Sequence, residues 1–193
     1  MALYKRLLAG RISVTDTLFV EVVGRNGGLI EKIHPCELVG GGWGTVYERA
    51  VGQHYEDLGY RIDYRGAQLG FRDQGVDLVA SSDAEQRFVQ CKFLLRTFSP
   101  QRVEQVLFKA SALVIKSSRP GAIFELAMPS LALAFPTRRT RTGREVPNGA
   151  LARLLAANKQ QSRVKVIASE IPLPIKAPRF DPVALGIAPI VPP

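Results

Sequence analysis

The feature that most constrains the fold is the order of periodic segments between residues 43 and 117. Apolar side chains recur at helical spacing from Trp43 to Leu58, and Gly59 is a natural terminator for that helix. Three short alternating segments that are typical of strands follow, at 60–64, 76–80 and 87–94. A second helix is expected to run from its cap at Ser99 to Lys116. This order predicts an α/β fold with a mixed central sheet flanked by helices.

The segments before this core and within it are less regular. We expect residues 1–42 to be an N-terminal decoration, with a helix at Ala2–Ala9 and a strand at Thr15–Val23. Three glycines at 40–42 then mark a boundary in the chain. Residues 66–75 are expected to form a loop, because they follow neither the helical nor the strand period.

The C-terminal part continues the core before it becomes rich in proline. Residues 123–135 predict one or two strands interrupted at Pro129. Asn148 is a candidate cap for a helix through Asn158, and a strand is expected at 163–169. From Ile171 prolines recur every few residues, which prevents further helix or sheet. We therefore expect a core domain over 43–170 and an extended Pro-rich tail over 171–193.

Charge and hydropathy exclude several classes of protein. The chain carries 26 basic and 17 acidic residues, and its pI near 9.9 favours a polyanionic partner such as nucleic acid, although a solvated basic surface is the alternative. The apolar run at 126–135 contains Pro129 and falls short of the roughly 20 residues of a membrane span. The N-terminal apolar stretch is too short for a signal peptide, so we expect a cytoplasmic protein.

Two cysteines do not make a disulfide scaffold. Cys36 and Cys91 could be grouped with His34 and His54, but the spacing matches no zinc pattern. Reduced thiols are the expected state.

The strands carry residues that suit phosphodiester cleavage. That reaction needs a divalent cation held by hard oxygen ligands. Asp77 offers a carboxylate, Gln90 an amide oxygen and Cys91 a backbone carbonyl, while Glu48 of the preceding helix could complete the metal shell. Lys92 lies two residues from Gln90 and so on the same side of the strand, where its charge could hold the attacking water or stabilise the transition state. On spacing alone, a solvated pair of strands explains the pattern equally simply.

The wider context resembles a known family. The motifs Tyr47-Glu48, Leu58-Gly59-Tyr60, 73–78 (Asp-Gln-Gly-Val-Asp-Leu) and 89–92 (Val-Gln-Cys-Lys) occur in the order found in the catalytic domain of Mrr-like restriction endonucleases. These enzymes belong to the PD-(D/E)xK nuclease superfamily, which also includes Holliday-junction resolvases. The resemblance covers roughly residues 45–117.

The resemblance implies a restriction-endonuclease-like fold with Glu48, Asp77, Gln90 and Lys92 as catalytic and metal-binding residues. It implies a Mg²⁺-dependent DNA endonuclease, with Mn²⁺ as a substitute, acting in restriction, mobile-element defence or DNA repair. Most of the superfamily has Glu or Asp where this chain has Gln90, but the Mrr-like branch itself uses Gln. The amide removes one negative charge, so metal binding should depend more on Asp77 and Glu48.

Two other functions stay open from the sequence. One is a structure-specific resolvase that cuts branched DNA as a dimer, and the other is a catalytically silent DNA-binding module of the same fold. Only 42 residues precede the core, too few for a winged helix like that of Mrr proteins, so DNA recognition would come from the core, a separate partner or a second copy of the chain.

Basic residues outside the motif are candidate DNA contacts. They are Arg72 in the loop before Asp77 and the cluster Arg138, Arg139, Arg141 and Arg144. The cluster could clamp phosphates beside the cleft or be a solvated loop. For Arg102 and Lys109 on the helix after the motif, DNA contact and simple solvation are equally open.

Overall fold

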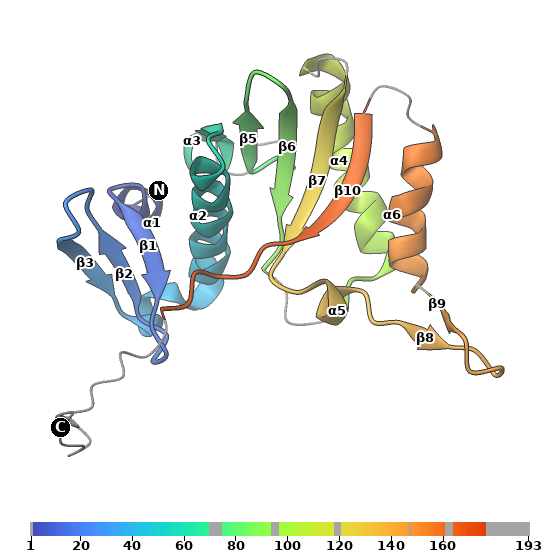
Figure 1. Ribbon diagram of the computed structural model, residues 1–193, viewed down its shortest axis with the longest axis horizontal. Coiled ribbons are helices and arrows are strands. Elements are labelled where there is room, and N and C mark those ends of the chain that lie inside the picture. The colour runs from blue at the N-terminus through green and yellow to red at the C-terminus, as the bar shows by residue number, and fades with distance from the viewer. Residues whose placement is uncertain are drawn as a thin grey trace, which may run out of the picture.

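A mixed five-stranded sheet forms the centre of the computed structural model, with strand order β10-β7-β6-β5-β4 (Figure 1). The model describes residues 2–69, 75–93, 97–117, 121–146, 148–160 and 164–176. The strands are β4 (Arg61–Tyr64), β5 (Leu78–Ser81), β6 (Gln86–Cys91), β7 (Ala122–Met128) and β10 (Val164–Glu170). Neighbours among β4, β5 and β6 are antiparallel, whereas β6, β7 and β10 are parallel. The predicted α/β class with a mixed sheet is confirmed.

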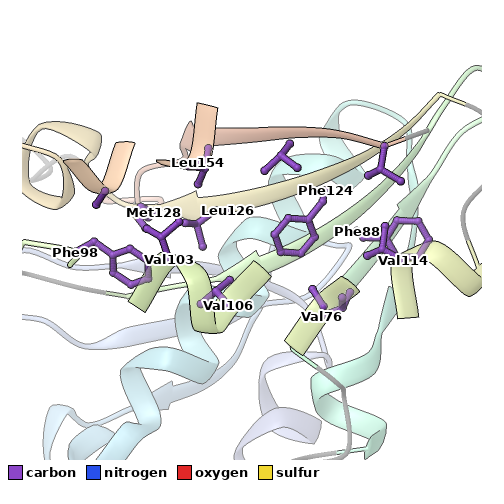
Figure 2. Close-up of a cluster of buried hydrophobic side chains, with 14 of the residues drawn as sticks. Val76, Phe88, Phe98, Val103, Val106, Val114, Phe124, Leu126, Met128 and Leu154 are labelled. Atoms are coloured by element: carbon purple, nitrogen blue, oxygen red, sulfur yellow. The ribbon is translucent and has the colours of Figure 1, made fainter. Parts of the chain in front are cut away.

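Helices cover both faces of this sheet. They are α2 (Gly42–Asp57) on one face, and α4 (Pro100–Ser117) and α6 (Gly149–Gln160) on the other. Alternate side chains of β6 divide between the two faces, as the period of a strand requires. Phe88 packs in the cluster under α4 with Val103 (Figure 2), whereas Val89 packs in a second cluster with Tyr47 and Val51 of α2.

Residues 2–33 form a second unit that packs against α2. It consists of α1 (Ala2–Leu7) and an antiparallel sheet of β1 (Arg11–Val14), β2 (Val20–Val23) and β3 (Leu29–Ile33). Two buried polar side chains of α2 reach its backbone. Gln53 accepts from the Ile12 amide at 2.7 Å and donates to the Ile12 carbonyl at 3.1 Å, while Arg49 donates to the carbonyls of Leu7 and Gly10 at 3.3 and 2.9 Å. These bonds satisfy polar groups that would otherwise be buried without partners.

Most predicted elements of the core are confirmed within a few residues. Gly59 follows α2 with φ +84°, the left-handed conformation that ends many helices. Ser99 caps α4 by accepting from the Arg102 amide at 3.3 Å, and Asn148 caps α6 by accepting from the Leu151 amide at 3.1 Å.

Three predictions of local structure are wrong. The strand expected at Thr15–Val23 begins only at Val20, since residues 15–19 form a turn, and β1 and β3 were not foreseen. Residues 65–69 of the expected loop form a short helix, α3 (Arg65–Leu69). After Pro129 the chain forms helix α5 (Leu131–Ala134) instead of a second strand, because Ser130 caps it by accepting from the Leu133 amide at 3.4 Å.

The remaining described segments are a 3₁₀ helix at Pro35–Gly41 and a hairpin of β8 (Arg138–Arg139) and β9 (Glu145–Val146). After β10, residues 171–176 run along the N-terminal unit, where Ile175 bridges Val14. Residues 177–193 of the expected tail lie outside the described residues. Within the described part of the chain, no helix is long and apolar enough to cross a membrane.

Candidate active site

Four predicted site residues meet where β5 begins and β6 ends. Asp77 directly precedes β5, Gln90 and Cys91 are the last residues of β6, and Lys92 follows them. The two strands pair antiparallel with Leu78 opposite Val89, so these positions lie at one edge of the ladder. The antiparallel register therefore brings together residues that are thirteen or more positions apart in the sequence.

Asp77 is held by the backbone of β6. Its side chain is 5% exposed, and its Oδ2 accepts from the Cys91 amide at 2.7 Å. Its own amide donates to the Val89 carbonyl at 2.9 Å. Val76 is buried under α4, whereas Leu78 is buried in the cluster on α2. Packing on both sides therefore fixes the backbone that presents the Asp77 carboxylate.

Gln90 places its amide between two oxygen atoms. Its side chain is 4% exposed, and Nε2 donates to Asp77 Oδ2 and, at 3.5 Å, to the Cys91 carbonyl. A Cβ on Gly75 would lie 3.4 Å from the opposite end of that amide, Oε1. One positively polarised NH₂ group thus lies between a carboxylate and a carbonyl, the kind of position that also suits a cation.

Glu48 reaches the same region from α2. Its Oε2 accepts from the hydroxyl of Tyr4 in α1 at 2.8 Å. A Cβ on Gly66 would meet Glu48 Oε2 at 2.7 Å and the Asp77 carbonyl at 3.7 Å. The Gly66 amide donates to that carbonyl at 2.9 Å. Glycine at position 66 therefore lets α3 approach both candidate acidic residues.

The charges of this region influence one another. Burial, followed by the nearby Glu48 carboxylate, raises the pKa of the Tyr4 hydroxyl well above its usual range, with Asp77 also contributing. Burial likewise raises the pKa of the Cys91 thiol, Asp77 and Glu48 raise it further, and Lys92 opposes them. Both groups therefore stay protonated near neutral pH, and Cys91 has both carboxylates and the Lys92 ammonium within electrostatic range.

Lys92 is tied to the sheet through its backbone. Its amide donates to the Ala127 carbonyl of β7 at 2.9 Å, and its side chain is half-buried. This contact continues the pairing of β6 with β7 one residue beyond the strand.

The structure does not bring the predicted arginine cluster to this region. Arg138, Arg139, Arg141 and Arg144 are exposed on the β8–β9 hairpin and the turn between its strands. In Figure 1 this hairpin projects beyond α5, at the opposite end of the molecule from the N-terminal unit. Arg139 faces Glu145 across the hairpin at 3.5 Å. Arg72, the other predicted DNA contact, lies outside the described residues.

A different buried carboxylate, Glu125 on β7, has a complete set of structural partners. It is 1% exposed, accepts from the Tyr55 hydroxyl at 2.6 Å and pairs with Arg87 at 2.9 Å. A paired and hydrogen-bonded buried charge needs no ligand to explain it.

The oxygen atoms near Asp77 suit a hard divalent cation such as Mg²⁺ or Mn²⁺. Asp77 and Glu48 would supply carboxylates, Cys91 its carbonyl, and Gln90 its amide oxygen after the amide turns over to exchange Nε2 for Oε1. The described residues contain no group of three or more His, Cys, Asp or Glu side chains placed to hold a metal. Asp77 and Glu48 make only two such side chains, because the amide of Gln90 occupies the third position.

Two residues near the site were not foreseen from the sequence. Tyr4 belongs to a segment expected to be a decoration, and it lies 44 positions from Glu48, so local periodicity gives no signal for their contact. Gly66 was placed in a loop, although a glycine near a motif can signal a close backbone approach.

Comparison of the chain with family models, curated proteins and solved structures gives no match.

Proposed function

We propose that this chain is a Mg²⁺-dependent DNA endonuclease of restriction-endonuclease-like fold, with Mn²⁺ as a substitute. The observation that carries the proposal is the NH₂ group of Gln90, which lies between Asp77 Oδ2 and the Cys91 carbonyl. A cation in that position would satisfy both oxygen atoms at once. The sequence resemblance to Mrr-like nucleases and the basic charge of the chain support the same function.

Each residue has a distinct part in this proposal. A bound divalent cation neutralises charge on the scissile phosphate and favours hydroxide formation. Asp77 anchors the site because the Cys91 amide fixes its carboxylate. Glu48 brings a second carboxylate whose orientation is set by Tyr4. Lys92 holds the attacking water or stabilises the charge that develops on the phosphate in the transition state.

Plasmid nicking in Mg²⁺ or Mn²⁺ tests the proposal. Asp77→Asn and Lys92→Met should each slow nicking by about 100-fold or more, the usual effect of removing a group that stabilises developing charge. Asp83→Asn and Lys165→Met make the same chemical changes at exposed positions and should leave the rate unchanged. Equal nicking by all five proteins would mean that the activity, if any, comes from a contaminant or another site.

The substrate range separates the alternatives. The amide of Gln90 donates to Asp77 where the wider superfamily has an acid, and this favours carrying a silent DNA-binding module as the second candidate. Salt-dependent DNA binding without metal-dependent cleavage would establish that module. Cleavage of four-way junctions but not of linear duplex would instead favour a resolvase.

A further inference from the structure

Helix α4 segregates its charged side chains onto two flanks. Its three basic residues, Arg102, Lys109 and Lys116, follow one another at intervals of seven and are all exposed. Seven residues are close to two helical turns, so the three side chains form a row along one flank, with Cα atoms about 10.5 Å apart. No ion pair occupies these three residues within the described part of the chain. The one acidic residue, Glu104, lies on the other flank and pairs with Arg153 of α6.

The basic row lies on the flank of α4 next to the candidate active site. A Cβ on Gly75 would lie 3.0 Å from Lys109 Cβ and 3.4 Å from Gln90 Oε1. Lys109 therefore leaves the helix beside the amide that contacts Asp77. The row continues from there in both directions along the helix axis, because Arg102 lies two turns before Lys109 and Lys116 two turns after it.

We infer that the row formed by Arg102, Lys109 and Lys116 binds the phosphate backbone of duplex DNA and leads it past the active site. This inference rests on the proposed function and extends it to the path of the substrate. Glu48 and Asp77 repel an approaching phosphate, so a nearby row of unpaired cations is needed to hold the strand there. The row spans about 21 Å of helix, which matches about six base pairs at roughly 3.4 Å each.

The length and even spacing of the row favour a regular polyanion over an acidic protein patch. Phosphates recur along a duplex at a fixed interval, and each one that is neutralised releases condensed counterions. Three contacts of this kind make a measurable contribution to the salt dependence of binding, whichever base sequence is bound.

The test compares two variants that each lose three positive charges. The first carries Arg102→Ala, Lys109→Ala and Lys116→Ala, and the second carries Arg25→Ala, Arg61→Ala and Lys165→Ala, all exposed in the structure. Binding to a 30-base-pair duplex is followed by fluorescence anisotropy in EDTA, between about 50 and 200 mM salt, the range in which phosphate contacts dominate. Thermal unfolding confirms that both variants are folded.

The first variant should lower the slope of log K against log salt by about 2.7, at about 0.9 for each phosphate contact. Wild type then loses about 40-fold more affinity than this variant over the salt range. The second variant should keep the wild-type slope. Equal changes in the two variants, an unchanged slope in the first, or tighter binding to polyglutamate than to DNA would each overturn the inference.

Failure of the nuclease proposal gives a different result. Because the binding assay contains no divalent cation, a protein that binds DNA through the row but never cleaves it retains this inference and loses only the proposed activity. A Lys109→Arg variant, which keeps the charge, should restore the slope that Lys109→Ala lowers.

Discussion

Replacing Tyr4 by Phe should loosen the candidate site without altering any proposed metal ligand. The substitution removes one hydroxyl, whose hydrogen bond to Glu48 Oε2 is 2.8 Å long. Tyr4 is 7% exposed, so water cannot easily replace the lost donor. A hydrogen bond to a charged group contributes about 1.5–3 kcal/mol, and the free energy of unfolding without metal should fall by about that amount.

The same change should weaken metal binding. Partners that orient a metal-binding carboxylate typically contribute 10–100-fold to affinity, so the dissociation constant for Mn²⁺ should rise by about that factor. Titration of free Mn²⁺ by electron paramagnetic resonance measures this constant without any DNA or turnover.

Tyr47→Phe is the matched control. Tyr47 neighbours Glu48 on α2 and is fully buried, but its hydroxyl donates to the Ile171 carbonyl at 3.0 Å. It should therefore lower stability by about 1 kcal/mol, as for a neutral hydrogen bond, and leave the affinity for Mn²⁺ unchanged. The reasoning is refuted if Tyr4→Phe binds Mn²⁺ as tightly as wild type, or if Tyr47→Phe weakens binding equally.

Three further predictions follow from close contacts and burial. Gly66→Ala places a Cβ within 2.7 Å of Glu48 Oε2, so it should displace that carboxylate and weaken Mn²⁺ binding while the urea midpoint stays within error of wild type. Gly52→Ala, whose Cβ would lie 2.3–2.5 Å from the tyrosine ring of β4, should lower the urea midpoint, because overpacking costs about 1–3 kcal/mol and exceeds the gain of about 1 kcal/mol in helix propensity. At pH 8 a disulfide reagent should modify the exposed Cys36 quickly and Cys91 only in urea, since burial raises the pKa of the Cys91 thiol and keeps it protonated; rapid reaction of two thiols in the native protein would contradict this.

The core of the fold could be predicted because its segments have strong periods. Amphipathic spacing gave both α2 and α4, and caps at Ser99 and Asn148 marked helix starts that the structure confirms. Alternation along β6 correctly separated Phe88 from Val89. By contrast, β1 and β3 have only four and five residues, and short segments carry too few side chains for their period to be distinguished from a turn.

The candidate site could be predicted only where its residues are close in sequence or fall in a motif. Gln90 and Cys91 are adjacent, and the antiparallel pairing of β5 with β6 brings Asp77 to them. The contribution of Tyr4 depends on tertiary packing of α1 against α2, which no local pattern encodes. Lys109 was indistinguishable from a solvated lysine until Gly75 placed it beside Gln90.

The central claim is that the oxygen atoms around the Gln90 amide form a divalent-cation site. A crystal structure with Mn²⁺ and anomalous scattering data tests this most directly. We predict a manganese peak within about 2–2.5 Å of Asp77, of Gln90 Oε1 and of the Cys91 carbonyl, with the Gln90 amide turned over from its present orientation. No peak there at saturating Mn²⁺, with Gln90 Nε2 still donating to Asp77, would contradict the claim.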